Sequence, residues 1–465
     1  MFNSERKTGI VLGQISIALR NALGLLLIPF IIHHVGVNNY GVYSLVSSLA
    51  LYLVVLEFGL SNTVVRYLSK YNAENNKAAE SQFLGMMLSI YVVICCLVIS
   101  AGLTLWYFMP ALFSEGLTPL EITLLQQSFL ILLVNIIITL MANSFTGVIT
   151  AYEKFTFQMS SQIVLFLIRC SAVFFALVLG YGVLVIVAID TVINALHTLL
   201  KLFYVFFRLK VRIHFIWPNI ELLKEVFIYT GFIAIGVIIN QINWRLDNFI
   251  LGVLTNSQTL GVFNIGLQLI LSYIAFASAI SNVFTPKLFK MVTLKANLTE
   301  LTQELINIGR LQMMVLGFVL SAFIVFGALF IQLFVGDEFA LAYWVALLPM
   351  LPFTFVLAQT SATSILQAMN KHKTRSLLLL ATAVINIVIS VLLVKNIGLL
   401  GASIGTCFSL VIGELLLVNI YLVRSIGIDM VSFYRIIIRS TVPGIIFTSC
   451  LGGSYRLIFQ QHGLV

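Results

Sequence analysis

Apolar runs of about 20 residues recur along almost the whole chain, and the apolar residues within them are continuous rather than alternating. A run of this length matches an α-helix that crosses the hydrocarbon core of a bilayer. Only 9% of the 465 residues are charged, whereas a soluble domain carries about 25%. Because bare backbone cannot lie in lipid, we predict an all-α polytopic membrane protein.

The hydropathy pattern predicts thirteen membrane spans, within an expected range of about 12–14 transmembrane helices. The first run, from Gly9 to about His33, is too long for a signal peptide and lacks a small-residue cleavage site. The predicted spans are about 9–33, 41–60, 83–108, 122–146, 158–180, 182–207, 227–254, 261–285, 306–334, 342–366, 375–394, 398–422 and 436–459.

Basic residues gather in alternate loops between these spans, and Lys395 is the single basic residue in the opposite set. The opposite loops hold acids such as Glu115 and Asp337 instead. The positive-inside rule therefore places the N-terminus in the cytoplasm. The formal charge of +9 is then a topology signal, so we expect no nucleic-acid partner. An odd span count leaves the C-terminus either outside the cell or beyond Val465.

An internal repeat relates the two halves of the chain. "GLSNTVVRYL" (59–68) matches "AISNVFTPKL" (279–288), and "YGVYSL" (40–45) matches "LGVFNI" (260–265), both at an offset of 220 residues. Spans 1–6 would correspond to spans 7–12 as parallel repeats, with a substrate site between them. The predicted domains are an N-terminal bundle (1–212), a cytoplasmic linker (213–226), a C-terminal bundle (227–423) and an extra span (424–465).

Three arginines, Arg20, Arg169 and Arg245, lie inside predicted spans. An arginine at a bilayer centre costs about 2.5–3.5 kcal/mol, so such residues usually face a cavity or a partner. Arginines in a low-dielectric cavity favour an anionic ligand, such as a phosphate-bearing head group. The repeat aligns Arg20 and Asn21 with two amides of span 7. The predicted cavity residues are Arg20, Asn21, Arg169, Asn240, Gln241 and Arg245.

Span 6 carries a polar stripe of Asp190, Asn194, His197 and Lys201, spaced as one helical face. Two interpretations stay open for this stripe. Asp190 could pair with Arg169 to fix helix packing, or it could bind a proton or cation. His197 could titrate near neutral pH or simply accept a hydrogen bond. The candidate residues for ion or proton coupling are Asp190, His197, Asp247 and Glu414.

The sequence contains no phosphate-binding G-x-x-x-x-G-K-[ST] loop, no nucleophile motif and no metal-ligand spacing. We therefore predict neither enzymatic activity nor a cofactor. The cysteines lie in apolar runs and are interpreted as packing residues; they are Cys95, Cys96, Cys170, Cys407 and Cys450.

Several motifs resemble the polysaccharide transport family over nearly the whole chain. They include "HHVGVNNYGVYSL" (33–45), "LEFGLSNTVVRYLSKY" (56–71), "RLDNFILGVL" (245–254) and "FVGDEFALAYWVALLPML" (334–351). This family contains the Wzx-type O-antigen and capsule-unit flippases. It belongs to the multidrug/oligosaccharidyl-lipid/polysaccharide (MOP) exporter superfamily, with the MATE exporters and the lipid II flippase MurJ. Phe263, where a tyrosine is usual, and the thirteenth span depart from the pattern.

The resemblance implies a V-shaped pair of six-helix bundles that works by alternating access in the bacterial inner membrane. It implies an undecaprenyl-diphosphate-linked oligosaccharide as substrate, for O-antigen or other surface polysaccharide, with membrane lipids and polysaccharide polymerase machinery as partners. Arg20, Arg169 and Arg245 would then meet the diphosphate or acidic sugars. Two alternatives remain: a MATE-like cation-coupled multidrug exporter, which needs cavity carboxylates, and a non-transporting scaffold for glycan assembly.

Overall fold

The computed structural model describes residues 4–215, 223–224, 226, 230, 246–369 and 371–461. Within these ranges the regular structure is helical, and eleven helices are long and apolar enough to cross a membrane. The prediction of an all-α polytopic membrane protein is confirmed. Predicted span 7 (227–254) lies mostly outside the described ranges, although residues 246–254 are helical.

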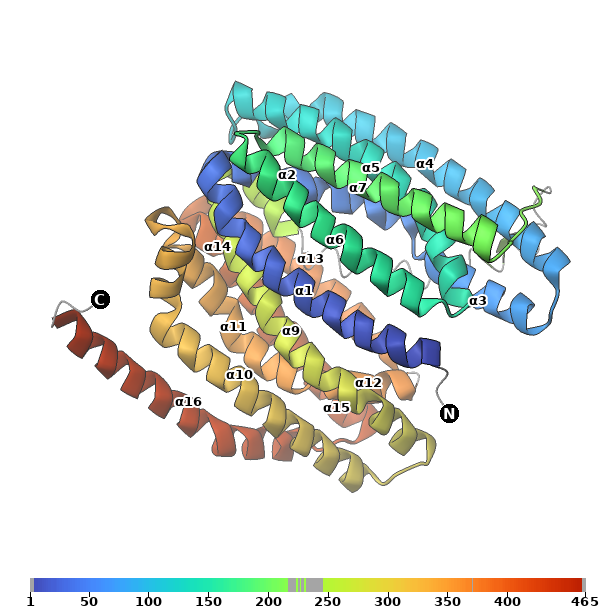
Figure 1. Ribbon diagram of the computed structural model, residues 1–465. Helices are drawn as coiled ribbons and strands as arrows, with labels where there is room; N and C mark the ends of the chain where they lie inside the picture. Colours follow the sequence, from blue (N-terminus) through green and yellow to red (C-terminus); the bar gives the residue numbers. More distant parts are fainter. Residues whose placement is uncertain are drawn as a thin grey trace. The chain divides into compact units, whose positions relative to one another are not determined.

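The chain divides into two compact units, residues 1–261 and 262–465 (Figure 1). The predicted linker at 213–226 lies largely outside the described residues. The predicted domain bounds therefore stay a prediction.

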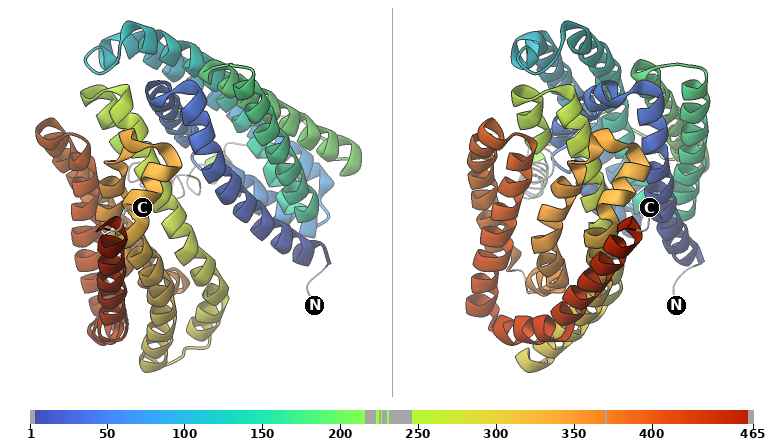
Figure 2. Two further views of the ribbon diagram at one scale, coloured as in Figure 1. Left: turned by 60° about the vertical axis from the view of Figure 1, so that its left-hand side comes forward. Right: turned by 90° about the vertical axis from the view of Figure 1, so that its left-hand side faces the viewer.

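The first unit is built from long helices that are joined by short turns (Figure 2). Its elements are α1 (Ser4–Val35), α2 (Val37–Val54), η1 (Val55–Glu57), α3 (Leu60–Ala73), α4 (Lys77–Phe113), α5 (Pro119–Ala151), α6 (Phe155–Val178), α7 (Val183–Phe203) and the π-helical turn η2 (Tyr204–Arg208).

The second unit contains most of α9 and all later helices. Its elements are α9 (Ser257–Thr293), α10 (Leu298–Val335), η3 (Asp337–Phe339), α11 (Ala342–Ala358), α12 (Thr360–Ala368), α13 (His372–Ile397), α14 (Leu399–Ser409), the π-helical η4 (Leu410–Leu417), α15 (Val418–Ile426) and α16 (Met430–Gln461).

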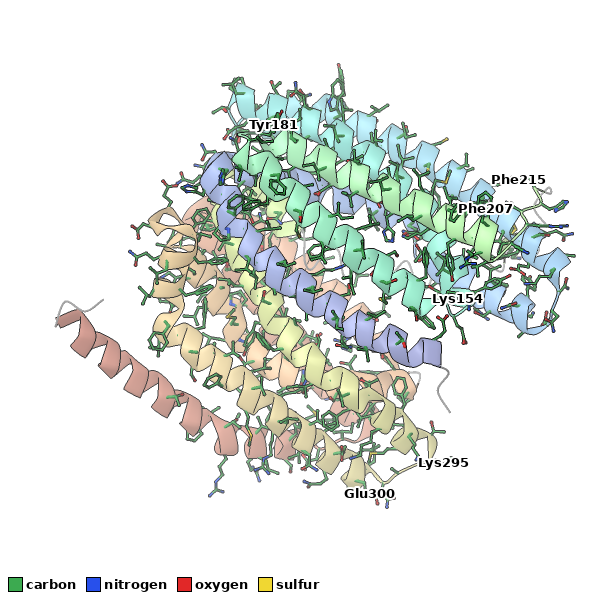
Figure 3. The ribbon with its side chains drawn as sticks, in the orientation of Figure 1. Lys154, Tyr181, Phe207, Phe215, Lys295 and Glu300 are labelled. Atoms are coloured by element: carbon green, nitrogen blue, oxygen red, sulfur yellow. The ribbon has the colours of Figure 1, made fainter. Side chains whose placement is uncertain are left out.

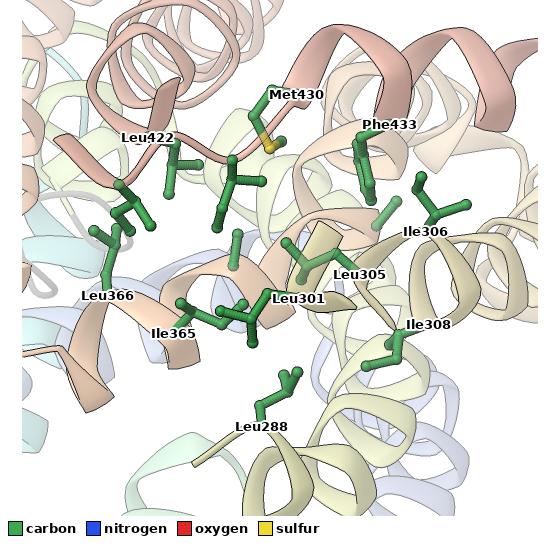
Figure 4. Close-up of a cluster of buried hydrophobic side chains, with 14 of the residues drawn as sticks. Leu288, Leu301, Leu305, Ile306, Ile308, Ile365, Leu366, Leu422, Met430 and Phe433 are labelled. Carbon is green, nitrogen blue, oxygen red and sulfur yellow. The ribbon is translucent and has the colours of Figure 1, made fainter. Parts of the chain in front are cut away.

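A cluster of buried apolar side chains forms part of the core of the second unit (Figure 4). The end of α9 and the start of α10 contribute Leu288, Leu301 and Leu305, which pack with α12, α15 and the start of α16. The predicted spans end at 285 and begin again at 306, but α9 continues to Thr293 and α10 begins at Leu298. Hydropathy follows only the apolar part of a helix, so it misses these polar extensions.

A break separates α2 from α3, where the sequence predicts the start of a basic loop. Phe58 and Gly59 both have positive φ angles, 53° and 75°, a conformation that glycine adopts without strain. Glu57, buried at this break, accepts hydrogen bonds from the Tyr91 hydroxyl at 3.1 Å and the Asn143 amide at 2.7 Å. These bonds satisfy a carboxylate inside an apolar span and tie the break to α4 and α5.

Helix α1 packs closely along α6, and two small residues allow the approach. Gly9 and Gly13 are four residues apart on α1, the spacing of small residues at close helix contacts. A Cβ atom at Gly9 would lie 2.4 Å from Phe155 Cβ, so any side chain there would force the helices apart. This contact sets the position of α1, and with it Arg20, against α6.

The Gly9→Leu variant is expected to lower thermal stability, because overpacking a close contact costs about 1–3 kcal/mol. The measurement is the unfolding temperature of the purified protein in detergent. Gly24→Leu on the same helix is the matched control, because no neighbouring atom lies within 4 Å of a Cβ built there. Equal unfolding temperatures for the two variants would contradict the assigned role of Gly9.

Candidate functional site

A cavity of about 220 Å³ lies within the first unit, between α1, α6 and α7. Its walls combine aromatic and aliphatic side chains with polar and charged groups at mid-helix positions. The lining residues are Arg20, Gln162, Leu165, Phe166, Arg169, Asp190, Ile193, Asn194 and His197. The structure therefore brings together two of the three predicted arginines and most of the predicted stripe on α7.

Arg20 reaches from α1 toward α6. Its Nη2 donates a hydrogen bond to Gln162 Oε1 at 3.2 Å, and its guanidinium carbon lies 5.9 Å from the centre of the Phe166 ring. No carboxylate of the described residues forms an ion pair with Arg20. Its positive charge is therefore uncompensated and available to a ligand.

Arg169 has a different environment in the same cavity. Its Nε lies 2.5 Å from Asp190 Oδ1 and its Nη2 lies 3.0 Å from Asp190 Oδ2. This two-pronged geometry matches the guanidinium fork to the carboxylate and neutralises both charges. The structure thus forms the packing pair between α6 and α7 that the sequence left as one of two interpretations.

The polar stripe on α7 continues toward the C-terminal end of the helix after Asp190. Asn194 donates to Asn135 Oδ1 and Thr139 Oγ1 of α5, both at 2.6 Å. His197 Nε2 lies 3.3 Å from Ser161 Oγ of α6. Lys201, one turn further, is 8% exposed and forms no ion pair within the described part of the chain. Lys201 therefore adds a second positive charge close to the cavity.

The other predicted site residues lie elsewhere. Asn21 is exposed on α1 and does not line the cavity, and Asp247 is half-buried in the helical stretch 246–254. Asn240, Gln241 and Arg245 fall outside the described residues.

Glu414 belongs to the second unit, in the π-helical segment η4. Its Oε1 lies 2.5 Å from Arg375 Nη2, and its backbone carbonyl accepts a hydrogen bond from Gln359 at 3.0 Å. Sequence reasoning places Arg375 at the edge of a basic loop, but the structure uses it to neutralise Glu414.

Sequence reasoning missed Gln162 and Phe166, the direct neighbours of Arg20. Both could have been found, because Gln162, Phe166 and Arg169 follow the i, i+4, i+7 spacing of one helix face. Among the described residues, no group of three or more His, Cys, Asp or Glu could hold a metal ion. The lining of the site offers hydrogen-bond donors and positive charge.

Comparisons with known proteins place this geometry in context. Residues 8–292 match the family described as "Polysaccharide biosynthesis protein". The "Putative O-antigen transporter" of Shigella flexneri is 20% identical over 84% of this chain and 92% of its own length. The "Capsular polysaccharide biosynthesis protein CapF" of Staphylococcus aureus is 26% identical over 40% of this chain and 47% of its own length.

Solved structures share the fold. The lipid II flippase MurJ in an inward closed conformation aligns with a TM-score of 0.74 and 15% identity, covering 97% of this chain and 99% of that chain. An inward-facing MATE family multidrug transporter of the MOP superfamily aligns with a TM-score of 0.68 and 14% identity. The alignment covers 90% of this chain and 99% of that chain. At these identities the likeness establishes the fold and leaves the substrate to other arguments.

Proposed function

Because this chain belongs to the polysaccharide biosynthesis protein family, we propose that it is a flippase for undecaprenyl-diphosphate-linked oligosaccharide repeat units. The family match confirms the predicted resemblance to polysaccharide transport proteins, and the O-antigen relative and the shared fold support a Wzx-type member of the MOP superfamily. The eleven candidate spans make it a multi-pass membrane protein. We place it in the bacterial inner membrane, with the N-terminus in the cytoplasm.

The proposal of an anionic substrate is based on the uncompensated positive charge of Arg20. A guanidinium inside an apolar span, held by an amide rather than a carboxylate, retains its capacity for an anion. A diphosphate offers oxygens that accept bidentate, charge-assisted hydrogen bonds. Lys201, close by on α7, adds to the same positive field. This sign of charge favours a phosphate-bearing lipid over the cationic drugs that a multidrug exporter of similar fold would carry.

The predicted cavity set keeps distinct roles in this proposal. Arg20 contacts the diphosphate, and Arg169 shapes the wall because Asp190 balances its charge. The proposed role of the amide side chains is to hydrogen-bond to sugar hydroxyls or phosphate oxygens. The amides and the third arginine assigned to the binding surface are Asn21, Asn240, Gln241 and Arg245.

The proposed cycle is alternating access. Spans 1–6 rock against spans 7–12 about the axis of the repeat, so the head group is exposed first to the cytoplasm and then to the outside. The polyprenyl tail stays in lipid throughout. The chain binds and moves its substrate without making or breaking a bond, and the polysaccharide polymerase machinery is the proposed downstream partner.

Coupling to an ion or proton is assigned to Asp190, His197, Asp247 and Glu414. Asp190 and Glu414 are each bound by an arginine, so a cation would have to displace that arginine. Among the described residues His197 has a hydroxyl partner, Ser161, and no ion pair. The positive charge of Arg20 in the same cavity, and that of Lys201 on the next turn, oppose a proton on its ring.

The test is transport by the purified protein in liposomes, with undecaprenyl-diphosphate oligosaccharide labelled on the sugar. Protein-dependent movement of the sugar between leaflets is the expected result, and a cationic dye should not be carried. Liposomes that contain protein inactivated by heat control for leakage. Export of the dye without movement of the lipid-linked sugar would instead establish a multidrug exporter.

A further inference from the structure

A second cavity, of about 650 Å³, lies in the first unit and is separate from the one that contains Arg20. It is formed by the start of α4, the turn after α5 and the segment that follows η2. The charged and polar lining residues are Lys77, Glu80, Ser81, Gln82, Tyr152, Lys210, Arg212 and His214. Lys154, two residues after Tyr152, lies 3.7 Å from Glu5. The cavity is therefore at the end of the unit where α1 begins.

The segment 209–214 forms a fixed wall of this cavity. Lys210 has a φ of 53°, which turns the chain back after η2. The His214 N–H then donates to the backbone carbonyl of Ser81 at 3.1 Å. Gly85 allows this approach, because a Cβ there would lie 2.0 Å from the carbonyl oxygen of His214. The wall is thus held against α4 by backbone contacts and is in place before any ligand binds.

The charge balance of the cavity is positive. Glu80 is 2% exposed and is bound by Lys77 Nζ at 2.7 Å and by the Tyr152 hydroxyl. Burial and this carboxylate raise the pKa of Tyr152, so its phenol stays a neutral donor. Lys210 and Arg212 are exposed and form no ion pair within the described ranges. Two positive charges are therefore left for a ligand.

Exposed aromatic side chains flank this positive wall. Phe207, in η2, is 68% exposed, and Phe215, at the end of the wall segment, is 71% exposed (Figure 3). Large apolar side chains in water are costly, but beside a bilayer they contact acyl chains. Positive charge next to exposed apolar surface is the pattern that binds an anionic lipid rather than a soluble anion.

We propose that this cavity binds the phosphate head group of an anionic phospholipid at the membrane surface. Lys210 and Arg212 bind the phosphate, and Phe207 and Phe215 lie against the acyl chains. The proposal depends on the membrane placement of the chain and does not depend on the transported substrate. A lipid held here ties the segment after η2 to the surface of the bilayer.

The experiment is native mass spectrometry of the detergent-solubilised protein, titrated with phosphatidylglycerol and, separately, with phosphatidylcholine. The wild type is expected to retain one phosphatidylglycerol more tightly than any phosphatidylcholine. Lys210→Gln with Arg212→Gln should weaken this first binding step about 30-fold, because each basic side chain near a lipid phosphate contributes about a fivefold change.

Lys290→Gln with Lys295→Gln is the matched control. This control also removes two positive charges, but from side chains that do not line the cavity. Like the test pair, it includes a lysine with a positive φ angle. The control should bind phosphatidylglycerol as the wild type does. An equal loss in the control, equal retention of the two lipids, or displacement of phosphatidylglycerol by millimolar inorganic phosphate would each overturn the proposal.

Discussion

The Arg20→Ala variant is expected to lose transport of lipid-linked oligosaccharide by about 100-fold while it still folds and inserts. A charge-assisted hydrogen bond contributes about 1.5–3 kcal/mol, and Arg20 holds the uncompensated guanidinium of its cavity. Among the described residues, this side chain makes a single hydrogen bond, to Gln162, so we expect its removal to cost the fold little. Arg20→Lys should recover part of the activity, because it keeps the charge and loses the fork of donors.

The measurement is the initial rate of sugar movement in liposomes that hold equal amounts of each variant. Arg435→Ala is the control, because Arg435 is an exposed arginine near the start of α16 and lies outside the cavity. The control should transport as the wild type does. Unchanged transport by Arg20→Ala, with a lower unfolding temperature, would make Arg20 a packing residue and remove the argument for an anionic substrate.

The positions of the cavity residues could be predicted from helical spacing, but their pairing could not. Periodicity places Asp190, Asn194 and His197 on one face of α7, as the structure confirms. It does not determine which neighbouring helix meets that face. Arg20 and Arg169 look alike in the sequence, yet packing gives Asp190 to one and an amide to the other. The different partners of the two arginines decide which one keeps an uncompensated charge. These partners depend on contacts between helices, which the sequence pattern does not determine.

The membrane spans were predictable because the bilayer fixes the length of an apolar helix. The ends of the helices were not, because hydropathy does not register the polar turns that continue α9 and α10 outside the apolar region. Helix α3 was also missed, because the sequence predicts a basic loop where this helix begins. The break before it is tied in place by hydrogen bonds from Tyr91 and Asn143 to Glu57, from which they are 34 and 86 residues away in sequence.

The Asp190→Ala variant is expected to destabilise the protein by about 3 kcal/mol, because it leaves Arg169 charged and unpaired between α6 and α7. The two side chains are only 26% and 21% exposed, so water cannot fully replace the lost partner. Thermal unfolding of the purified variant in detergent measures this loss. Arg169→Ala should have a comparable effect, because it leaves the carboxylate without its partner.

The double variant Arg169→Met with Asp190→Leu separates packing from binding. Replacing a buried ion pair by apolar side chains of similar size is often close to neutral, so most of the stability should return. Because the pair carries no net charge, transport should stay within about tenfold of the wild type, well above the level expected for Arg20→Ala. If stability returned while transport was abolished, Arg169 would contact the substrate directly, and the ion pair would have to open during each cycle.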